Sequence, residues 1–246
     1  MLICPHTTKA SLVALGIFGA GAAVTAAAFH LIKRRGSARL SHGTPLPPLT
    51  ASVSELRRML AVIETEILPR TKKQVETAGD KVFGAAVLDE SFKTVLAETN
   101  HETLCPLYHG EVYTIQQWAG IKTKKPSARD SIFLSTHEPC CMCISSIVWS
   151  GFRKCFYLFP YETTRDQGIP HDLKIMHELW RVERYAERNE FCSTAGLLSL
   201  IEDLQEGPEK KELQETARRI TQTYDELSKK YHGEKGANAK NTLAFH

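Results

Sequence analysis

Three cysteines occupy four neighbouring positions in the middle of the chain, in the stretch HEPCCMC at residues 137–143. Pro139 suits the first turn of a helix, because the N–H group that proline lacks would have no partner there. Residues three apart on a helix face the same side, whereas neighbours diverge by about 100°. We therefore expect Cys140 and Cys143 to face one metal ion together, and Cys141 to pack as a small apolar side chain.

The expected position of this pair at the start of a helix suits a metal site. Free N–H groups and the helix dipole stabilise thiolates there, and a thiolate is the form that binds zinc. The chain has seven cysteines, an odd number with three clustered, which is not typical of a disulfide framework. For the CxxC motif taken alone, a redox site of the thioredoxin type is the alternative.

A third ligand is available in LYHGEV, residues 107–112, where His109 opens a second predicted helix. This helix precedes the strand that leads to Pro139, so both helix starts can meet at the carboxyl ends of adjacent strands. Taken alone, His109 is typical of a capping or solvated histidine. Together with Glu111 and the cysteine pair, it completes the H-x-E…P-C-x-x-C pattern of zinc deaminases.

This paired motif resembles the cytidine deaminase superfamily, and the resemblance covers roughly residues 54–188. Within the superfamily, THEPCCMC is most similar to the branch of guanine deaminases, tRNA adenosine deaminases and fungal cytosine deaminases. The resemblance implies a hydrolase that acts on the C–N bonds of cyclic amidines and releases ammonia. It also implies Zn²⁺ as the cofactor, with His109, Cys140 and Cys143 as its ligands.

The resemblance assigns further roles to residues near the metal. Zinc keeps a fourth position for water and lowers the pKa of that water to about 7, while Glu111 carries the proton to the ring and to the departing amine. Asn100 resembles the asparagine that binds the base, and residues 163–172, which include Asp166, resemble the loop after the fourth strand of guanine deaminases. Tyr108 either forms an aromatic wall for the base or fills the core.

The implied substrate is a nucleobase or nucleoside, of the guanine or cytosine type. Two alternatives are an adenosine deaminase that acts on tRNA and a deaminase-like module that binds zinc without turnover. Charge disfavours a nucleic acid partner. Residues 1–50 contain five of the 31 lysines and arginines and no acid, which leaves 26 bases against all 28 acids in the rest. A domain with this balance lacks the basic surface that binds a phosphate backbone.

The elements around the motifs predict an α/β fold, and the resemblance implies a three-layer α/β/α sandwich of the cytidine deaminase type with a mixed sheet. Strands that alternate with helices imply parallel neighbours joined by crossovers, and two adjacent strand-like runs predict a hairpin. One expected helix begins at Ser54, and the others span 109–119, 140–149, 171–187, 195–204 and 209–231. The expected strands span 81–89, 93–100, 131–136 and 154–159. The last helix has one apolar seam, which indicates packing on its own domain; a dimerising coil is the alternative.

The N-terminal part of the sequence predicts a membrane anchor. Residues 10–32 contain no charge, and 23 residues of helix at about 1.5 Å per residue reach across a bilayer. Lysine and arginine follow this run, which predicts a catalytic domain on the side of the cytosol or the mitochondrial matrix. A cleaved signal peptide, for which Ala26 and Ala28 form an A-x-A cleavage site, or an organelle-targeting peptide is the alternative.

The sequence thus predicts four parts. An N-terminal segment with a hydrophobic helix at 10–32 spans residues 1–32, a basic and proline-rich linker spans 33–53, the deaminase domain spans 54–206, and a C-terminal helix and tail span 207–246. Members of the family commonly associate, so the resemblance also suggests a homodimer.

Overall fold

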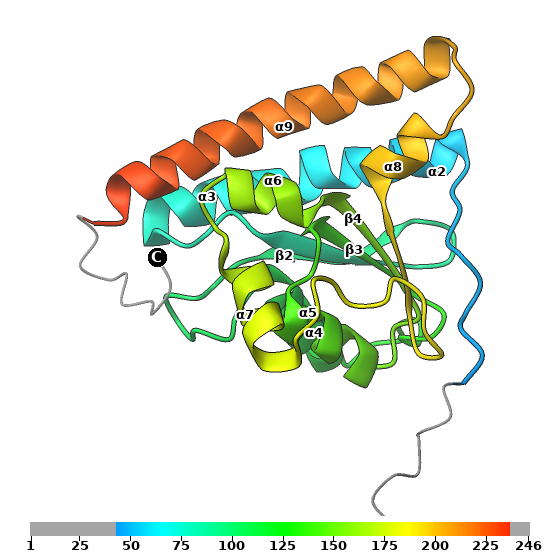
Figure 1. Cartoon of the computed structure of the whole chain (residues 1–246), viewed down its shortest axis with the longest axis horizontal. Helices are drawn as coiled ribbons and strands as arrows, with labels where there is room; N and C mark the ends of the chain where they lie inside the picture. Colours follow the sequence, from blue (N-terminus) through cyan, green and yellow to red (C-terminus); the bar gives the residue numbers. More distant parts are fainter. Residues whose placement is uncertain (1–42, 237–246) are drawn as a thin grey trace, which may run out of the picture. The chain divides into compact units, whose positions relative to one another are not determined.

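The computed structural model describes residues 43–236, and Figure 1 shows how their elements are arranged. Five strands form one mixed sheet in the order β2-β1-β3-β4-β5. Strand β1 pairs antiparallel with β2 and β3, while β3, β4 and β5 run parallel. The strands are β1 (Gly84–Leu88), β2 (Thr94–Thr99), β3 (Ile132–His137), β4 (Lys154–Phe159) and β5 (Ser193–Gly196).

Strand direction brings the two motif-bearing segments to one edge of the sheet. Strands β2 and β3 both run opposite to β1, which lies between them, so their carboxyl ends point the same way. Helix α4 (Gly110–Gly120) follows β2, and helix α5 (Cys141–Trp149) follows β3. Both helices therefore begin at the same edge, as predicted, although β2 and β3 are not the adjacent strands that the sequence analysis expects, because β1 lies between them.

Helices cover both faces of the sheet. Successive side chains of a strand point to opposite faces, and here apolar side chains are buried on both of them. In β1, Ala86 and Leu88 belong to one core cluster, whereas Ala85 and Val87 belong to the other. Figure 1 shows α2, α3, α8 and α9 on one side and α4, α5 and α7 on the other. The predicted α/β fold with a mixed sheet is confirmed. Besides α4 and α5, the described helices are α2 (Val53–Val62), the π-helical turn η1 (Ile63–Ile67), α3 (Leu68–Ala78), α6 (Tyr161–Asp166), α7 (His171–Trp180), α8 (Leu197–Glu202) and α9 (Pro208–Glu234).

The long helix α9 packs on its own domain. Its apolar residues Leu213, Ile220 and Tyr224 are buried in the same core cluster as Leu56 and Leu60 of α2. The apolar seam that the sequence shows is therefore used within this chain, and it is not left open for a coil with a second copy.

Two segments differ from the sequence prediction. The helix predicted over 195–204 is shorter, because Ser193–Gly196 pairs with the open edge of β4 and only Leu197–Glu202 is helical. The helix predicted over 171–187 ends at Trp180, where Arg181 takes the left-handed conformation with φ 58°. Pairing with a distant strand is a tertiary contact, and a four-residue segment gives no periodic signal of it.

The glycine between the two motif residues of α4 is required by a close backbone approach. A Cβ atom at Gly110 would lie 2.7 Å from the Cα and 2.8 Å from the N of Gly84 in β1. Such overlap with main-chain atoms forces backbone shifts, which cost about 1–3 kcal/mol. We expect Gly110→Ala to lower the free energy of unfolding by that amount, measured by denaturant titration.

Gly120 provides the control for this substitution, because it ends the same helix and a Cβ there meets no atom within 4 Å. We expect Gly120→Ala to leave the free energy of unfolding within about 1 kcal/mol of the wild type. Equal stability of Gly110→Ala and the wild type would contradict the close approach.

The predicted membrane-anchored localisation is wrong. Among residues 43–236, no helix combines the length and the apolar character needed to cross a membrane. The hydrophobic helix predicted at 10–32, on which that localisation and the membrane partner were based, lies outside the residues that the structure describes.

Candidate metal centre and active site

Two helix starts converge on one point at the edge of the sheet. His109 is the N-cap residue of α4, and Cys140 is the N-cap residue of α5. The Nδ1 atom of His109 lies 3.6 Å from the Sγ atoms of both Cys140 and Cys143. All three ligand atoms lie within 4.8 Å of one another.

These distances fit a tetrahedral zinc ion. Bonds of about 2.3 Å to sulfur and about 2.0–2.1 Å to nitrogen, at the tetrahedral angle, separate the nitrogen and sulfur ligands by about 3.6 Å. One imidazole and two thiolates also form the donor set of catalytic zinc sites that keep a fourth position open. Cys141 lies apart from this group and packs against Tyr161 and Met176. The structure therefore brings together the three residues that the sequence selects as ligands.

Glu111 lies beside the metal group without belonging to it. Its side chain is buried in the first turn of α4, and its Oε2 atom accepts a hydrogen bond of 3.3 Å from the Cys143 thiol. Its Oε1 atom accepts one of 3.0 Å from the Ser135 hydroxyl. Ser135 comes from the middle of β3, where a small buried residue gives no sequence signal of a role at the site.

The charges at the site favour binding of a cation. A hydrogen bond from the Cys143 thiol and the nearby His109 ring hold the pKa of Cys140 well below its usual range. Burial alone would lower the pKa of His109, but hydrogen bonds to Cys140 and Glu102 raise it well above the usual value. Burial, followed by the negative charge of Cys140, raises the pKa of Glu111. Zinc at this point would replace the shared protons of the ligands and neutralise the thiolate charge.

A second carboxylate, which the sequence analysis did not select, contacts the ring nitrogen of His109 that faces away from the two sulfurs. The Oε1 atom of Glu102 lies 3.3 Å from His109 Nε2 and 3.1 Å from Lys81 Nζ. The Oε2 atom of Glu102 accepts a hydrogen bond from the Asn100 amide. Glu102 lies in the irregular segment between β2 and α4, where no periodicity indicates which side chains point inward.

The metal group forms part of the wall of a cavity of about 350 Å³. Most of the lining is apolar, and His171 and Asp172 at the start of α7 add polar groups. Burial, followed by the charge of Cys140, raises the pKa of Asp172 to about 8. The apolar side chains of the lining are Phe83, Pro106, Leu107, Met142, Ile169, Ile175 and Leu179.

The three predicted substrate contacts, Asn100, Tyr108 and Asp166, do not line the cavity at the metal group. Asn100 is fully buried behind Glu102, and its Oδ1 atom has no hydrogen-bond partner. Tyr108 accepts a hydrogen bond of 2.9 Å from Gln116 and packs against Tyr113. Neither residue lines the cavity at the metal group. Asp166 is 68% exposed and belongs to another pocket, so the structure does not bring it to the metal group.

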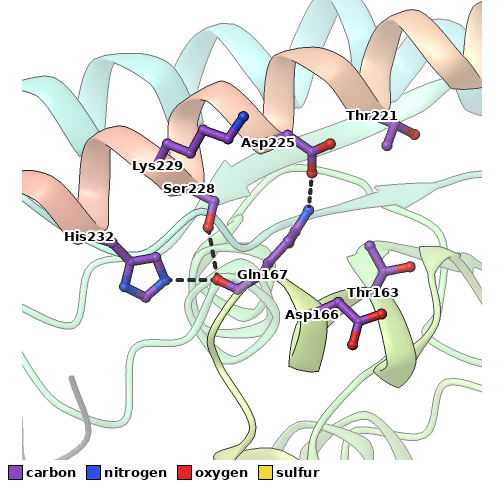
Figure 2. A pocket seen from close by; sticks show the side chains of 8 residues that line it. All are labelled: Thr163, Asp166, Gln167, Thr221, Asp225, Ser228, Lys229 and His232. Carbon is purple, nitrogen blue, oxygen red and sulfur yellow. Dashed lines mark hydrogen bonds between the residues drawn. The ribbon is translucent and has the colours of Figure 1, made fainter.

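The pocket that contains Asp166 has a volume of about 620 Å³ and lies between α6 and α9 (Figure 2). Gln167 connects the two helices there, since its side-chain amide donates to Asp225 at 2.9 Å and its backbone carbonyl accepts from His232 at 2.8 Å. Within the loop that the sequence analysis selected, Asp172 is the acid that reaches the metal cavity.

Residues 65–159 match the family model described as the cytidine and deoxycytidylate deaminase zinc-binding region. This region belongs to the cytidine deaminase superfamily. The matched part of the deaminase domain contains His109, Glu111, Cys140 and Cys143, and zinc is therefore its cofactor. Helix α7, with Asp172, lies beyond the matched residues.

The deaminase domain is also similar to several solved structures. One is a guanine deaminase from Nitrosomonas europaea, with 16% identity and a TM-score of 0.43, over 90% of this chain and 100% of that one. A guanine deaminase from Bacillus subtilis has 18% identity and a TM-score of 0.40, over 69% and 95%. A third is from work on tRNA:A34 deaminases, with 16% identity and a TM-score of 0.35, over 59% and 94%. These low values support no inference about the substrate, and no curated protein matches the sequence.

Proposed function

We propose that this protein is a zinc-dependent hydrolytic deaminase of a free nucleobase or nucleoside, of the guanine or cytosine type. The observation that supports this proposal is the position of Glu111. Its carboxylate is buried, lies 3.3 Å from a sulfur of the metal group, and is not part of the ligand set. A structural zinc site is usually closed by four protein ligands and has no use for a carboxylate of this kind.

The residues of the site have separate tasks in the proposed reaction. His109, Cys140 and Cys143 would hold zinc, which would supply the Lewis acidity that activates water. Glu111 takes the first proton of that water with Oε2 and gives it to the ring nitrogen, and it then takes the second proton from the added hydroxyl group and gives it to the departing amine, which leaves as ammonia. The hydrogen bond from Ser135 to Oε1 keeps the other oxygen directed toward the metal group.

The cavity supports a small, uncharged substrate. Its volume of about 350 Å³ and its largely apolar lining suit a planar heterocycle, and the Asp172 carboxyl in the same lining suits a hydrogen bond to a ring substituent. Among the lining residues that the structure describes, Lys81 is the one lysine or arginine, and its ammonium group is paired with Glu102. A nucleotide phosphate would therefore find no unpaired lysine or arginine in this cavity.

The test uses the full chain, loaded with zinc, and measures ammonia release from guanine, cytosine, adenine, cytidine and deoxycytidine. We expect turnover of at least one of these compounds. Inosine formation in tRNA, without turnover of any free base or nucleoside, would support an adenosine deaminase for tRNA instead. Bound zinc with no turnover of any of them would support a silent zinc-binding module.

A further inference from the structure

Glu102 is a buried carboxylate on which three donors converge. Its side chain is 3% exposed, and the Nε2 atom of His109 and the Nζ atom of Lys81 both lie within 3.3 Å of its Oε1 atom. The amide of Asn100 donates to its Oε2 atom. A buried carboxylate is costly unless its charge is paired and both its oxygens accept hydrogen bonds, and Glu102 meets both conditions.

The contact with His109 determines which of the two ring nitrogens can bind metal. The Nδ1 atom of His109 faces the two sulfurs, at 3.6 Å from each, and the Nε2 atom faces Glu102. A neutral imidazole carries one proton, so a proton on Nε2 leaves the lone pair of Nδ1 free for a metal. An acceptor at Nε2 stabilises this tautomer and also fixes the plane of the ring.

Lys81 stabilises the ionised form of the buried Glu102 carboxylate. Its side chain is 8% exposed, and its ammonium group lies 3.1 Å from the same Oε1 atom that faces His109. A lysine paired in this way offsets the charge of Glu102 without competing for the ring, because ammonium is only a donor. The pair therefore keeps a buried acceptor available to Nε2.

We propose that Glu102 is a positioning residue of the metal centre, which holds His109 in the tautomer that binds zinc through Nδ1. Neither the motif nor the family match assigns a role to Glu102. The inference concerns the metal centre, and it does not require the proposed deaminase reaction.

The first test measures zinc affinity of the full chain by competition with a chromophoric chelator. Loss of an outer partner of a metal-binding histidine typically weakens metal affinity by about 10–100-fold, and we expect this loss for Glu102→Met, which removes both carboxylate oxygens and keeps the length of the side chain. Glu90→Met is the matched control, because Glu90 is exposed and its replacement makes the same charge change. We expect the control to bind zinc as the wild type does. Wild-type affinity in Glu102→Met would overturn the proposal.

A double variant separates the role toward His109 from the cost of leaving Lys81 unpaired. Lys81→Met/Glu102→Met buries no unpaired charge, so its stability should return toward that of the wild type. Its zinc affinity should nevertheless remain about 10–100-fold below the wild-type value. Recovery of full affinity in the double variant would show that Glu102 serves only to neutralise Lys81, and the proposal would then be wrong.

The tautomer can also be read directly in the wild-type protein. In a ¹⁵N–¹H spectrum of the zinc-loaded full chain, the proposal requires the proton of His109 on Nε2, and a proton on Nδ1 would contradict it. None of these measurements depends on turnover. A wild type that releases no ammonia but shows the Glu102 effect would remove the proposed function and leave this inference intact.

Discussion

Glu111→Gln is expected to abolish deamination while zinc stays bound. Glutamine keeps the shape of the side chain and can still accept the hydrogen bond from Ser135, but it cannot take up a proton. Loss of a positioned acid–base group typically costs about 10²–10⁴-fold in rate, so we expect kcat to fall by at least that factor. Ammonia release and the zinc content of the same preparation are the measurements.

Ser135→Ala provides a graded control for this prediction. It removes the hydroxyl that donates to Glu111 Oε1 but leaves the carboxylate in place. We expect a smaller loss of activity, with zinc retained. If Glu111→Gln turned over substrate at the wild-type rate, or if it lost its zinc, the carboxylate would be a structural group of the metal site and the assignment of proton transfer to it would fail.

Cys143→Ser is expected to remove zinc from the protein. Cys143 is fully buried, and its sulfur lies 3.6 Å from the ligand nitrogen of His109. Loss of a direct ligand should weaken zinc binding by more than the about 10–100-fold typical of a lost outer partner. Because metal that binds only the folded state stabilises it, added zinc should raise the Tm of the wild type and have little effect on this variant.

The neighbouring cysteine is the matched control for the loss of Cys143. Cys141→Ser makes the same chemical change two positions away, at a side chain that packs against Tyr161 and Met176. We expect this variant to bind zinc with the wild-type affinity and to keep its response to added metal. Zinc loss in Cys141→Ser together with zinc retention in Cys143→Ser would contradict the ligand set.

The metal ligands were predictable from one short-range feature of the sequence and one feature of the fold. The spacing of Cys140 and Cys143 places both on one side of a helix, whatever the rest of the fold. The placement of His109 needs a further condition, that β2 and β3 end at the same edge, and the alternation of elements already indicates this. The mixed sheet follows from the same pattern.

The residues that support the ligands were not predictable in this way. Glu102 lies in an irregular segment between β2 and α4. Its contact with His109 depends on how that segment folds back on Lys81, which lies just before β1. Asp166 lies apart from the metal cavity because residues 161–166 form a separate short helix, which is followed by Gly168 in a left-handed conformation at φ 84°. The chain reverses there, and only the residues after the turn reach the metal cavity.

The close packing of α9 against α2 has a consequence for how this protein can be shortened. The family match ends at residue 159, before β5 and α9, although Tyr224 of α9 is packed against Phe159 and His137 of the sheet. A fragment cut to the matched residues would retain the zinc ligands and Glu111, but the apolar core side chains that α9 covers would be exposed to water. The matched residues therefore contain the metal site, but a fragment that folds by itself must begin before Val53 and extend beyond Tyr231.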